Sequence, residues 1–275
     1  GADFDAVVVG AGFGGLYAVH KLRNEQGLNI QAYDNAGDVG GTWYWNRYPG
    51  ALSDTESFCY RYSFDKELLQ KGRWKTRYLT QPEILEYLSE VADHFDLRRS
   101  YQFNTKVTAA HFNEESGLWR VSTDKGHTVT AKYLITGLGL LSAINKPKFK
   151  RVEEFKGQIL HTGAWPEGVD LSGKKIGVIG TGSTGVQVII ALAPIARHLT
   201  VFQRSAQYVV PIGNWPESEA KIKEYKANYD AIWKQVKESV VAFGFKESQV
   251  TCASVSEEER ESIFERIWHL GGGFR

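Results

Sequence analysis

The sequence predicts an α/β fold with two Rossmann-like dinucleotide-binding domains, the first carrying a β-meander and the second a helical insertion. Two glycine motifs support this prediction, because each follows a buried strand, opens a helix and precedes a second strand. The chain has 275 residues, of which 42% are hydrophobic. That length and composition suit a globular chain of one large domain or two smaller ones.

The first strand–helix–strand unit opens the chain. Residues 4–10 (FDAVVVG) read as a buried parallel strand, residues 12–23 as a helix and residues 28–34 (LNIQAYD) as a second strand. The loop between the first strand and the helix reads Gly10-Ala11-Gly12-Phe13-Gly14-Gly15, which fits the pattern G-x-G-x-x-G.

The three glycines of this pattern have separate physical roles. Gly10 allows the tight turn, Gly12 lets the backbone reach a pyrophosphate, and Gly15 lets helix and strand pack closely. The helix N-terminus then presents free N–H groups and a positive dipole end to the phosphates. We therefore expect a dinucleotide at this loop.

The chain between the two units has less regular patterning. Residues 35–64 are rich in glycine and aromatic residues, and we expect an ordered loop there. Helical apolar spacing predicts a helix over residues 81–98, with Pro82 in its first turn. Alternating apolar residues predict an antiparallel meander of three strands over residues 102–135.

The second unit repeats the pattern of the first. Residues 175–180 (KIGVIG) and 198–204 read as strands on either side of a helix over residues 184–197. Amphipathic helices are expected over residues 217–241 and 256–270. The second glycine loop reads Gly180-Thr181-Gly182-Ser183-Thr184-Gly185.

One matched position separates the two expected ligands. Asp34 lies 34 − 10 = 24 residues after the first glycine of its motif, and Arg204 lies 204 − 180 = 24 residues after Gly180. A carboxylate there accepts hydrogen bonds from ribose hydroxyls and repels a 2′-phosphate, which favours FAD or NAD. A guanidinium pairs with that phosphate, so the second unit is expected to bind NADPH, with Ser205 as a further donor. The alternative is that Arg204 is a solvated surface arginine.

Composition excludes several other functions. The net charge is +1 and no Lys/Arg block stands out, so we expect no nucleic acid and no membrane as partner. The two cysteines, Cys59 and Cys252, form no CxxC pair, which argues against a disulfide reductase, a disulfide framework and a metal site. Together with the lack of a signal peptide, they indicate a cytoplasmic protein. A chain that passes hydride from NADPH to a flavin must then deliver electrons to oxygen, another carrier or a partner protein.

Two further segments carry a family resemblance. Residues 155–166 (FKGQILHTGAWP) match F-x-G-x-x-x-H-x-x-x-W-P, and residues 40–51 (GGTWYWNRYPGA) form a second shared loop. In these segments the chain resembles Baeyer–Villiger monooxygenases, which are class B flavoproteins, and most of all the cyclohexanone monooxygenases. Flavin-containing N-hydroxylating monooxygenases are similar too, but their motif usually lacks the ending seen here as Trp165-Pro166.

The resemblance implies a reaction. NADPH reduces FAD, oxygen adds to give a C4a-peroxyflavin, and this species converts a ketone, expected to be cyclic, to an ester or lactone. The peroxide must stay deprotonated and water must be excluded. The expected small-molecule partners are therefore a ketone and O₂, and we expect a monomer.

The resemblance also implies site residues. Asp54 would act electrostatically, by orienting a catalytic arginine and the NADP amide; the alternative is an Asp that caps its own loop. His161 would position the linker between the domains rather than take part in chemistry. Flavin contacts are expected at Thr42, Trp43, Tyr60 and Val107, although core packing is a competing explanation for the aromatic residues.

The remaining implied residues border the other ligands. The nicotinamide end is expected near Leu52 and Ser53, and Gln187 joins the NADP phosphate loop of residues 181–185. An apolar ketone pocket is expected from Leu140, Leu141, Phe243 and Phe245, each of which could instead be core.

The resemblance further implies a longer protein, since the number of domains in family members corresponds to roughly twice this length. The family's catalytic arginine would lie beyond Arg275, and the chain would be an N-terminal half. We expect the start of an FAD domain at 1–141, a linker at 142–166, the start of an NADP domain at 167–213 and a helical insertion at 214–275. Two alternatives stay open: an N- or S-oxygenating flavin monooxygenase, and an incomplete fragment that oxidises NADPH without coupled oxygenation.

Overall fold

A computed structural model gives the fold of the chain. It describes residues 1–72, 74–240, 242–243 and 248–272. Within the described residues, no helix combines the length and the apolar character that crossing a membrane requires.

The chain divides into two compact units, each assembled from separate stretches of sequence. The first unit comprises Gly1–Ala51 and Gln81–Ser172, and the second comprises Leu52–Thr80 and Gly173–Arg275. Residues 52–80 therefore fold with the second glycine motif rather than with the first. The domain limits expected from the sequence stay a prediction.

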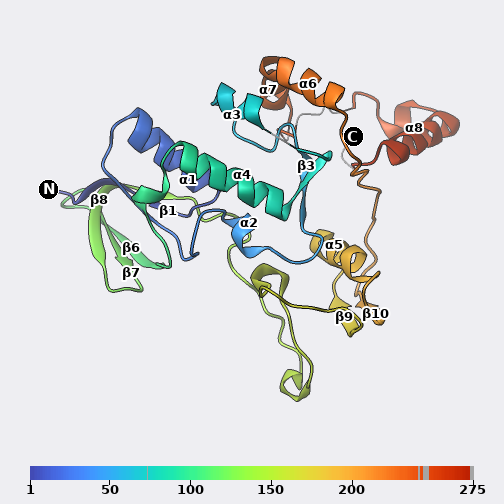
Figure 1. Cartoon of the computed structure of the whole chain (residues 1–275), viewed down its shortest axis with the longest axis horizontal. Coiled ribbons are helices and arrows are strands. Elements are labelled where there is room, and N and C mark those ends of the chain that lie inside the picture. The colour runs from blue at the N-terminus through green and yellow to red at the C-terminus, as the bar shows by residue number, and fades with distance from the viewer. Residues whose placement is uncertain (73, 241, 244–247, 273–275) are drawn as a thin grey trace. The chain divides into compact units, whose positions relative to one another are not determined.

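The first unit is built on a six-stranded sheet with the order β5-β2-β1-β8-β7-β6 (Figure 1). The central strand β1 pairs in parallel with both β2 and β8. Strands β6, β7 and β8 form the antiparallel meander that the alternating pattern predicts. The strands are β1 (Phe4–Val9), β2 (Ile30–Tyr33), β5 (Tyr101–Gln102), β6 (Val107–Asn113), β7 (Leu118–Thr123) and β8 (Thr128–Thr136).

Two long helical segments pack beside each other in the first unit (Figure 1). Helix α1 (Phe13–Val19) continues as a π-helical stretch, His20–Glu25, and α4 spans Gln81–His94. Their contact includes the rings of Phe13 and Tyr87, whose centroids are 6.2 Å apart. The helix predicted over residues 81–98 is thus confirmed, with an earlier end.

One core cluster of the first unit lies where the sheet crosses from parallel to antiparallel pairing. Val7, Tyr33, Val121 and Ala131 are buried together there. Burial of a side chain the size of Val contributes about 1.5–3 kcal/mol, so this apolar patterning holds β1 in the sheet centre. The strand then delivers Gly10 to the carboxyl edge of the sheet, where a ligand is expected.

The second unit contains a parallel strand pair, β9 (Lys175–Ile179) and β10 (His198–Phe202), with α5 (Ser183–Leu192) between them in sequence. It also contains an antiparallel pair formed by β3 (Leu52–Glu56) and β4 (Tyr78–Thr80). The predicted strand–helix–strand pattern is confirmed for this unit.

Two expectations about secondary structure were wrong. Residues 35–64 are not only loop, because they include the short helix α2 (Thr42–Trp45) and strand β3. Local sequence patterns do not reveal β3, because its partner strand is distant in sequence: Leu52 pairs with Thr80.

The second wrong expectation is a single helix over residues 217–241. The structure has two helices there, α6 (Glu219–Ala227) and α7 (Tyr229–Glu238), which meet at Asn228. The Asn228 backbone leaves the helical region, at φ −116° and ψ 18°, and its side-chain amide donates to the Glu224 carbonyl at 2.8 Å. Such local bonding favours a helix end over a helix interior.

The second unit also contains two other α-helices. Helix α3 spans Lys66–Lys71, and α8 spans Glu257–Leu270 within the range expected for the last amphipathic helix. The Ser256 hydroxyl accepts the Glu259 N–H at 3.2 Å and so caps α8.

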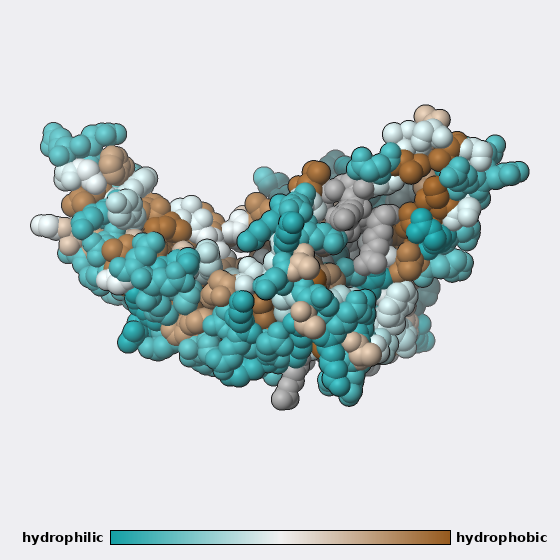
Figure 2. All heavy atoms as spheres, turned by 90° about the horizontal axis from the view of Figure 1, so that it is seen from above, coloured by the Kyte–Doolittle hydropathy of each residue, from teal (hydrophilic) through white to brown (hydrophobic). Residues whose placement is uncertain are grey.

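Hydrophobic side chains reach the surface among the hydrophilic ones, as the brown spheres of Figure 2 show. In the first unit Tyr133 is 61% exposed and Leu141 is 72% exposed. In the second unit Ile179 and Phe202 are exposed on the two paired strands. Within the residues described, these apolar side chains are therefore not covered by other parts of the chain.

Candidate cofactor sites

The first glycine loop has backbone geometry that only glycine accommodates. Gly10 has φ +110°, and a Cβ there would overlap the Gly137 carbonyl. A Cβ on Gly15 would overlap the Gly10 carbonyl oxygen. The loop therefore has the tight turn and the close helix–strand approach that the motif predicts.

Asp34 lies at the end of β2 and binds the loop backbone with both carboxylate oxygens. Oδ2 accepts the Ala11 N–H at 2.6 Å, and Oδ1 accepts the Ala36 N–H at 2.7 Å. The side chain is nearly buried. Each carboxylate oxygen accepts up to two hydrogen bonds, so capacity remains for ribose hydroxyls.

A second glycine pair brings the 40–51 loop against the first loop. The Gly40 N–H donates to the Ala11 carbonyl at 2.9 Å. Gly41 has φ +53°, and a Cβ there would lie 2.7 Å from the Gly12 Cα. This close backbone approach delivers α2, with Thr42 and Trp43, next to the dinucleotide loop.

Two side chains that the motifs do not include hold these loops. Gln81, at the start of α4, is buried and donates through Nε2 to the Trp43 carbonyl at 2.5 Å. Tyr101, on β5, donates its hydroxyl to the Gly10 carbonyl at 3.1 Å. Burial, and then the charge of Asp34, raise the pKa of Tyr101 strongly, so the hydroxyl stays a donor. Sequence reasoning missed both residues.

The other expected residues of the first unit vary in exposure. Trp43 is buried, Thr42 is exposed and Val107 is half-buried at the start of β6. Leu140 and Leu141 are exposed. The structure thus gives the two leucines no apolar pocket within the first unit.

His161 caps a short 3₁₀ turn, Thr162–Ala164, inside the linker segment. Its Nδ1 accepts the Gly163 N–H at 3.1 Å. A Cβ on Gly163 would contact Nδ1 and the Ile144 side chain, both at 3.4 Å. This bond holds the backbone of the turn that follows His161.

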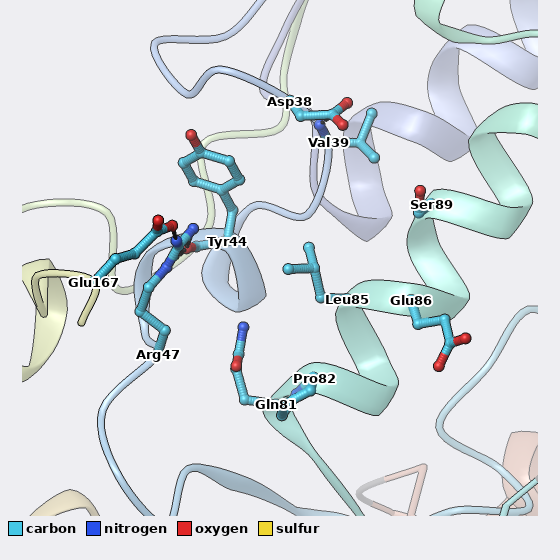
Figure 3. A pocket seen from close by; sticks show the side chains of 10 residues that line it. All are labelled: Asp38, Val39, Tyr44, Arg47, Gln81, Pro82, Leu85, Glu86, Ser89 and Glu167. Carbon is cyan, nitrogen blue, oxygen red and sulfur yellow. Dashed lines mark hydrogen bonds and ion pairs between the residues drawn. The ribbon is translucent and has the colours of Figure 1, made fainter.

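An open cavity of about 540 Å³ lies beside α2 and α4 (Figure 3). Arg47 points toward Glu167 across its rim and forms an ion pair with it, while the guanidinium lies 4.8 Å from the Tyr44 ring centre. The cavity contains none of the residues expected to bind cofactor or substrate. Its lining is Asp38, Val39, Tyr44, Arg47, Gln81, Pro82, Leu85, Glu86, Ser89 and Glu167.

Asp38 at the cavity is held in its charged form. Burial alone would raise the pKa of Asp38, but hydrogen bonds from Arg98 and Val39 lower it below the usual value. The Arg98 Nε lies 2.7 Å from Oδ1. This ion pair ties the segment before Gly40 to the 3₁₀ turn Arg98–Ser100 that follows α4, and so supports the loop that carries α2.

The second glycine loop repeats the geometry of the first. Gly180 has φ +103°, and a Cβ on Gly185 would overlap the Gly180 carbonyl oxygen. Helix α5 begins at Ser183, and no side chain caps its N-terminus. Its first N–H groups, from Ser183 onward, are therefore available for phosphate oxygens.

Gln187 connects this helix to β3. Its Nε2 donates to the Leu52 carbonyl at 3.1 Å. Leu52 and its neighbour Ser53 are the residues expected at the nicotinamide end, and Ser53 is 4% exposed. The second unit thus brings three of the expected nicotinamide and phosphate residues together, while Asp54 is exposed on the same strand.

The remaining expected residues of the second unit lie at its surface or near β3. Arg204 and Ser205 are exposed just beyond the end of β10. Tyr60 is half-buried, and the Phe243 carbonyl lies 3.8 Å from the Cys59 Sγ. Phe245 lies outside the described residues.

Comparisons with known proteins agree with the family that the motifs predict. The family described as flavin-binding monooxygenase-like matches residues 5–215. A Baeyer–Villiger monooxygenase of Pseudooceanicola batsensis is 77% identical over 274 residues, which is 100% of this chain and 50% of that protein. A phenazine N-monooxygenase of Lysobacter antibioticus is 53% identical over 272 residues, or 99% of this chain and 50% of that protein.

A solved structure agrees as well. The crystal structure of cyclohexanone monooxygenase from Rhodococcus sp. Phi1 bound to NADP⁺ matches with a TM-score of 0.97 and 62% identity, over 99% of this chain and 51% of that one. The predicted fold class and the resemblance to Baeyer–Villiger monooxygenases are confirmed. The chain spans about half the length of the curated relatives it matches.

Proposed function

Because this chain belongs to the flavin-binding monooxygenase-like family, we propose that the protein is an NADPH- and O₂-dependent Baeyer–Villiger monooxygenase. It converts ketones, including cyclic ones, to esters or lactones. The relatives named Baeyer–Villiger and cyclohexanone monooxygenase support this activity. The observation that carries the proposal is the pair of glycine loops, with Asp34 following one and Arg204 following the other.

The first loop fits FAD. Glycine at positions 10 and 15 permits the tight turn and the close helix–strand approach, because a Cβ there would overlap backbone atoms, and no cation follows β2 to attract a 2′-phosphate. We assign the loop to Gly10, Gly12, Phe13 and Gly15, with Asp34 at the ribose. Thr42, Trp43, Tyr60 and Val107 would border the flavin. When bound, FAD supplies the redox chemistry that activates oxygen.

The second loop fits NADPH. Thr181, Gly182, Ser183, Thr184 and Gly185 would offer backbone N–H groups and hydroxyls to the pyrophosphate. Beyond β10, Arg204 would pair with the 2′-phosphate and Ser205 would donate a further hydrogen bond.

Residues of β3 and the linker would orient the nicotinamide. Gln187 fixes the Leu52 carbonyl, and this contact supports a place for Leu52 and Ser53 at the nicotinamide end. The exposed carboxylate of Asp54 is available to hold an arginine or the nicotinamide amide by a charge-assisted hydrogen bond. His161 would act by shaping the linker through Gly163.

The ketone would contact apolar side chains, for which we propose Leu140, Leu141, Phe243 and Phe245. The two leucines are fully or largely exposed and thus free to meet a ligand or further protein.

The oligomeric state is proposed to be a monomer. A cytoplasmic location is inferred from Cys59 and Cys252, which form no disulfide in the part of the chain that the structure describes.

The test supplies NADPH, O₂ and cyclohexanone to the purified full chain, with any sequence that naturally flanks it, and analyses the product by mass spectrometry. A lactone is expected, one oxygen atom heavier than the ketone. A parallel reaction offers an aromatic N-heterocycle, because one relative is a phenazine N-monooxygenase. Formation of an N-oxide without lactone would contradict ketone oxygenation. NADPH consumption with hydrogen peroxide as the sole product would contradict both reactions.

A further inference from the structure

The peptide group between Gly10 and Ala11 opens the first glycine loop, and buried side chains hold it at both ends. Its carbonyl oxygen accepts the Tyr101 hydroxyl at 3.1 Å. Its N–H donates to Asp34 Oδ2 at 2.6 Å. These two bonds fix the orientation of one peptide plane at the residue where the chain has φ +110°. A peptide adjoining such a glycine has several accessible orientations unless something selects one.

Tyr101 is well placed to keep this role. It lies on β5, opposite Ala32 of β2, and only 9% of it is exposed. Its ring stacks on Phe103, with centroids 5.3 Å apart. The hydroxyl also lies 3.2 Å from where a Cβ on Gly15 would be, so it sits directly beneath the loop.

We propose that Tyr101 is a positioning residue for FAD, which acts with Asp34 to preorganise the Gly10–Ala11 peptide before the cofactor binds. This inference rests on the proposed assignment of FAD to the first unit. Asp34 then has two roles, since it bonds the loop backbone in addition to its expected contact with the ribose. Without the Tyr101 donor the Gly10 carbonyl loses this hydrogen bond. FAD binding must then order the loop, which lowers the affinity for FAD.

The test is Tyr101→Phe, which removes the hydroxyl and keeps the ring. Tyr33→Phe is the matched control: Tyr33 lies on the neighbouring strand β2 and is 2% exposed, and its hydroxyl makes no hydrogen bond with the residues that the structure describes. FAD affinity is measured by titrating the apoprotein of the full chain, with its natural flanking sequence, and following flavin fluorescence.

The dissociation constant for FAD should rise about five- to tenfold in Tyr101→Phe and stay unchanged in Tyr33→Phe, as expected for one hydrogen bond. The KM for NADPH should not change in either variant, which separates loop positioning from general damage. An FAD affinity in Tyr101→Phe equal to that of the parent protein overturns the inference, as does an equal loss in Tyr33→Phe. If the parent protein binds no FAD, the proposed function itself fails, and the inference fails with it.

Discussion

Arg77 and Glu56 form a nearly buried ion pair that joins β4 to β3. The Arg77 Nε lies 2.9 Å from the Glu56 Oε1, and the two side chains are 5% and 14% exposed. Arg77 Nη1 also donates to the Leu270 carbonyl at the end of α8, at 2.6 Å. One guanidinium thus connects the strand that carries Asp54 to the last helix of the second unit.

Arg77→Ala should therefore destabilise the second unit. Removing Arg77 takes the ion-pair partner at 2.9 Å from the nearly buried Glu56, and we expect a loss of about 3–5 kcal/mol. Urea unfolding checks this through the midpoint at unchanged slope. Arg266→Ala, at an exposed position on α8, is the control and should stay within about 0.5 kcal/mol of the parent protein. Equal midpoints for Arg77→Ala and the parent would show that the ion pair does not stabilise the fold.

Gly15→Ala should abolish FAD binding, because the added methyl group would overlap the Gly10 carbonyl oxygen. Gly14→Ala is a close control: it changes the adjacent residue of α1, where a Cβ meets nothing within 4 Å. Alanine in a helix is favoured over glycine by about 1 kcal/mol, so this variant should bind FAD and be slightly more stable. Flavin content after purification measures FAD binding in both variants. Retained FAD in Gly15→Ala would contradict the close packing of helix and loop.

Arg204→Ala should weaken NADPH and leave NADH nearly unchanged. The guanidinium is expected to meet the 2′-phosphate, which only NADPH carries, and its loss should raise the KM for NADPH on the order of tenfold or more. Steady-state kinetics with the two nucleotides give the comparison. Arg197→Ala removes another exposed arginine, just before β10 rather than after it, and should affect neither. Equal losses for NADPH and NADH in Arg204→Ala would refute the assignment.

His161→Ala should impair NADPH-dependent turnover more than FAD retention, since the Nδ1 bond to the Gly163 N–H shapes the linker. His161→Asn should restore much of the activity, because an Asn oxygen can accept the same N–H. The measurements are lactone formed per NADPH consumed and flavin content after purification. Isolation of His161→Ala without FAD would show that the residue supports FAD binding instead.

Local patterns identified the parts of the fold that depend on neighbouring residues. Apolar runs predict strands β1 and β9, and the glycine spacing predicts both loops. The structure shows why glycine is needed there, because a Cβ on Gly15 or Gly185 would overlap backbone. The pairing of β3 with β4 could not be read this way, because Leu52 and Thr80 are far apart in sequence. The helix break at Asn228 did leave a signal, since asparagine is unfavourable inside helices.

The same distinction applies to the candidate sites. Asp34 and Arg204 follow from a fixed spacing after each glycine motif, although their ligands are still proposals. Gln81 and Tyr101 bond backbone groups 38 and 91 residues away along the chain. Nothing in their local sequence indicates these partners, because the tertiary fold alone brings them together.

One measurement tests most directly whether one chain holds FAD at its first glycine loop and NADPH at its second. The FAD-loaded full chain, with any natural flanking sequence, is mixed anaerobically with NADPH or NADH while flavin absorbance is followed. We predict that NADPH removes the absorbance of oxidised flavin rapidly and that NADH does so far more slowly. Bound flavin that NADPH leaves oxidised, or that NADH reduces equally well, would contradict the account.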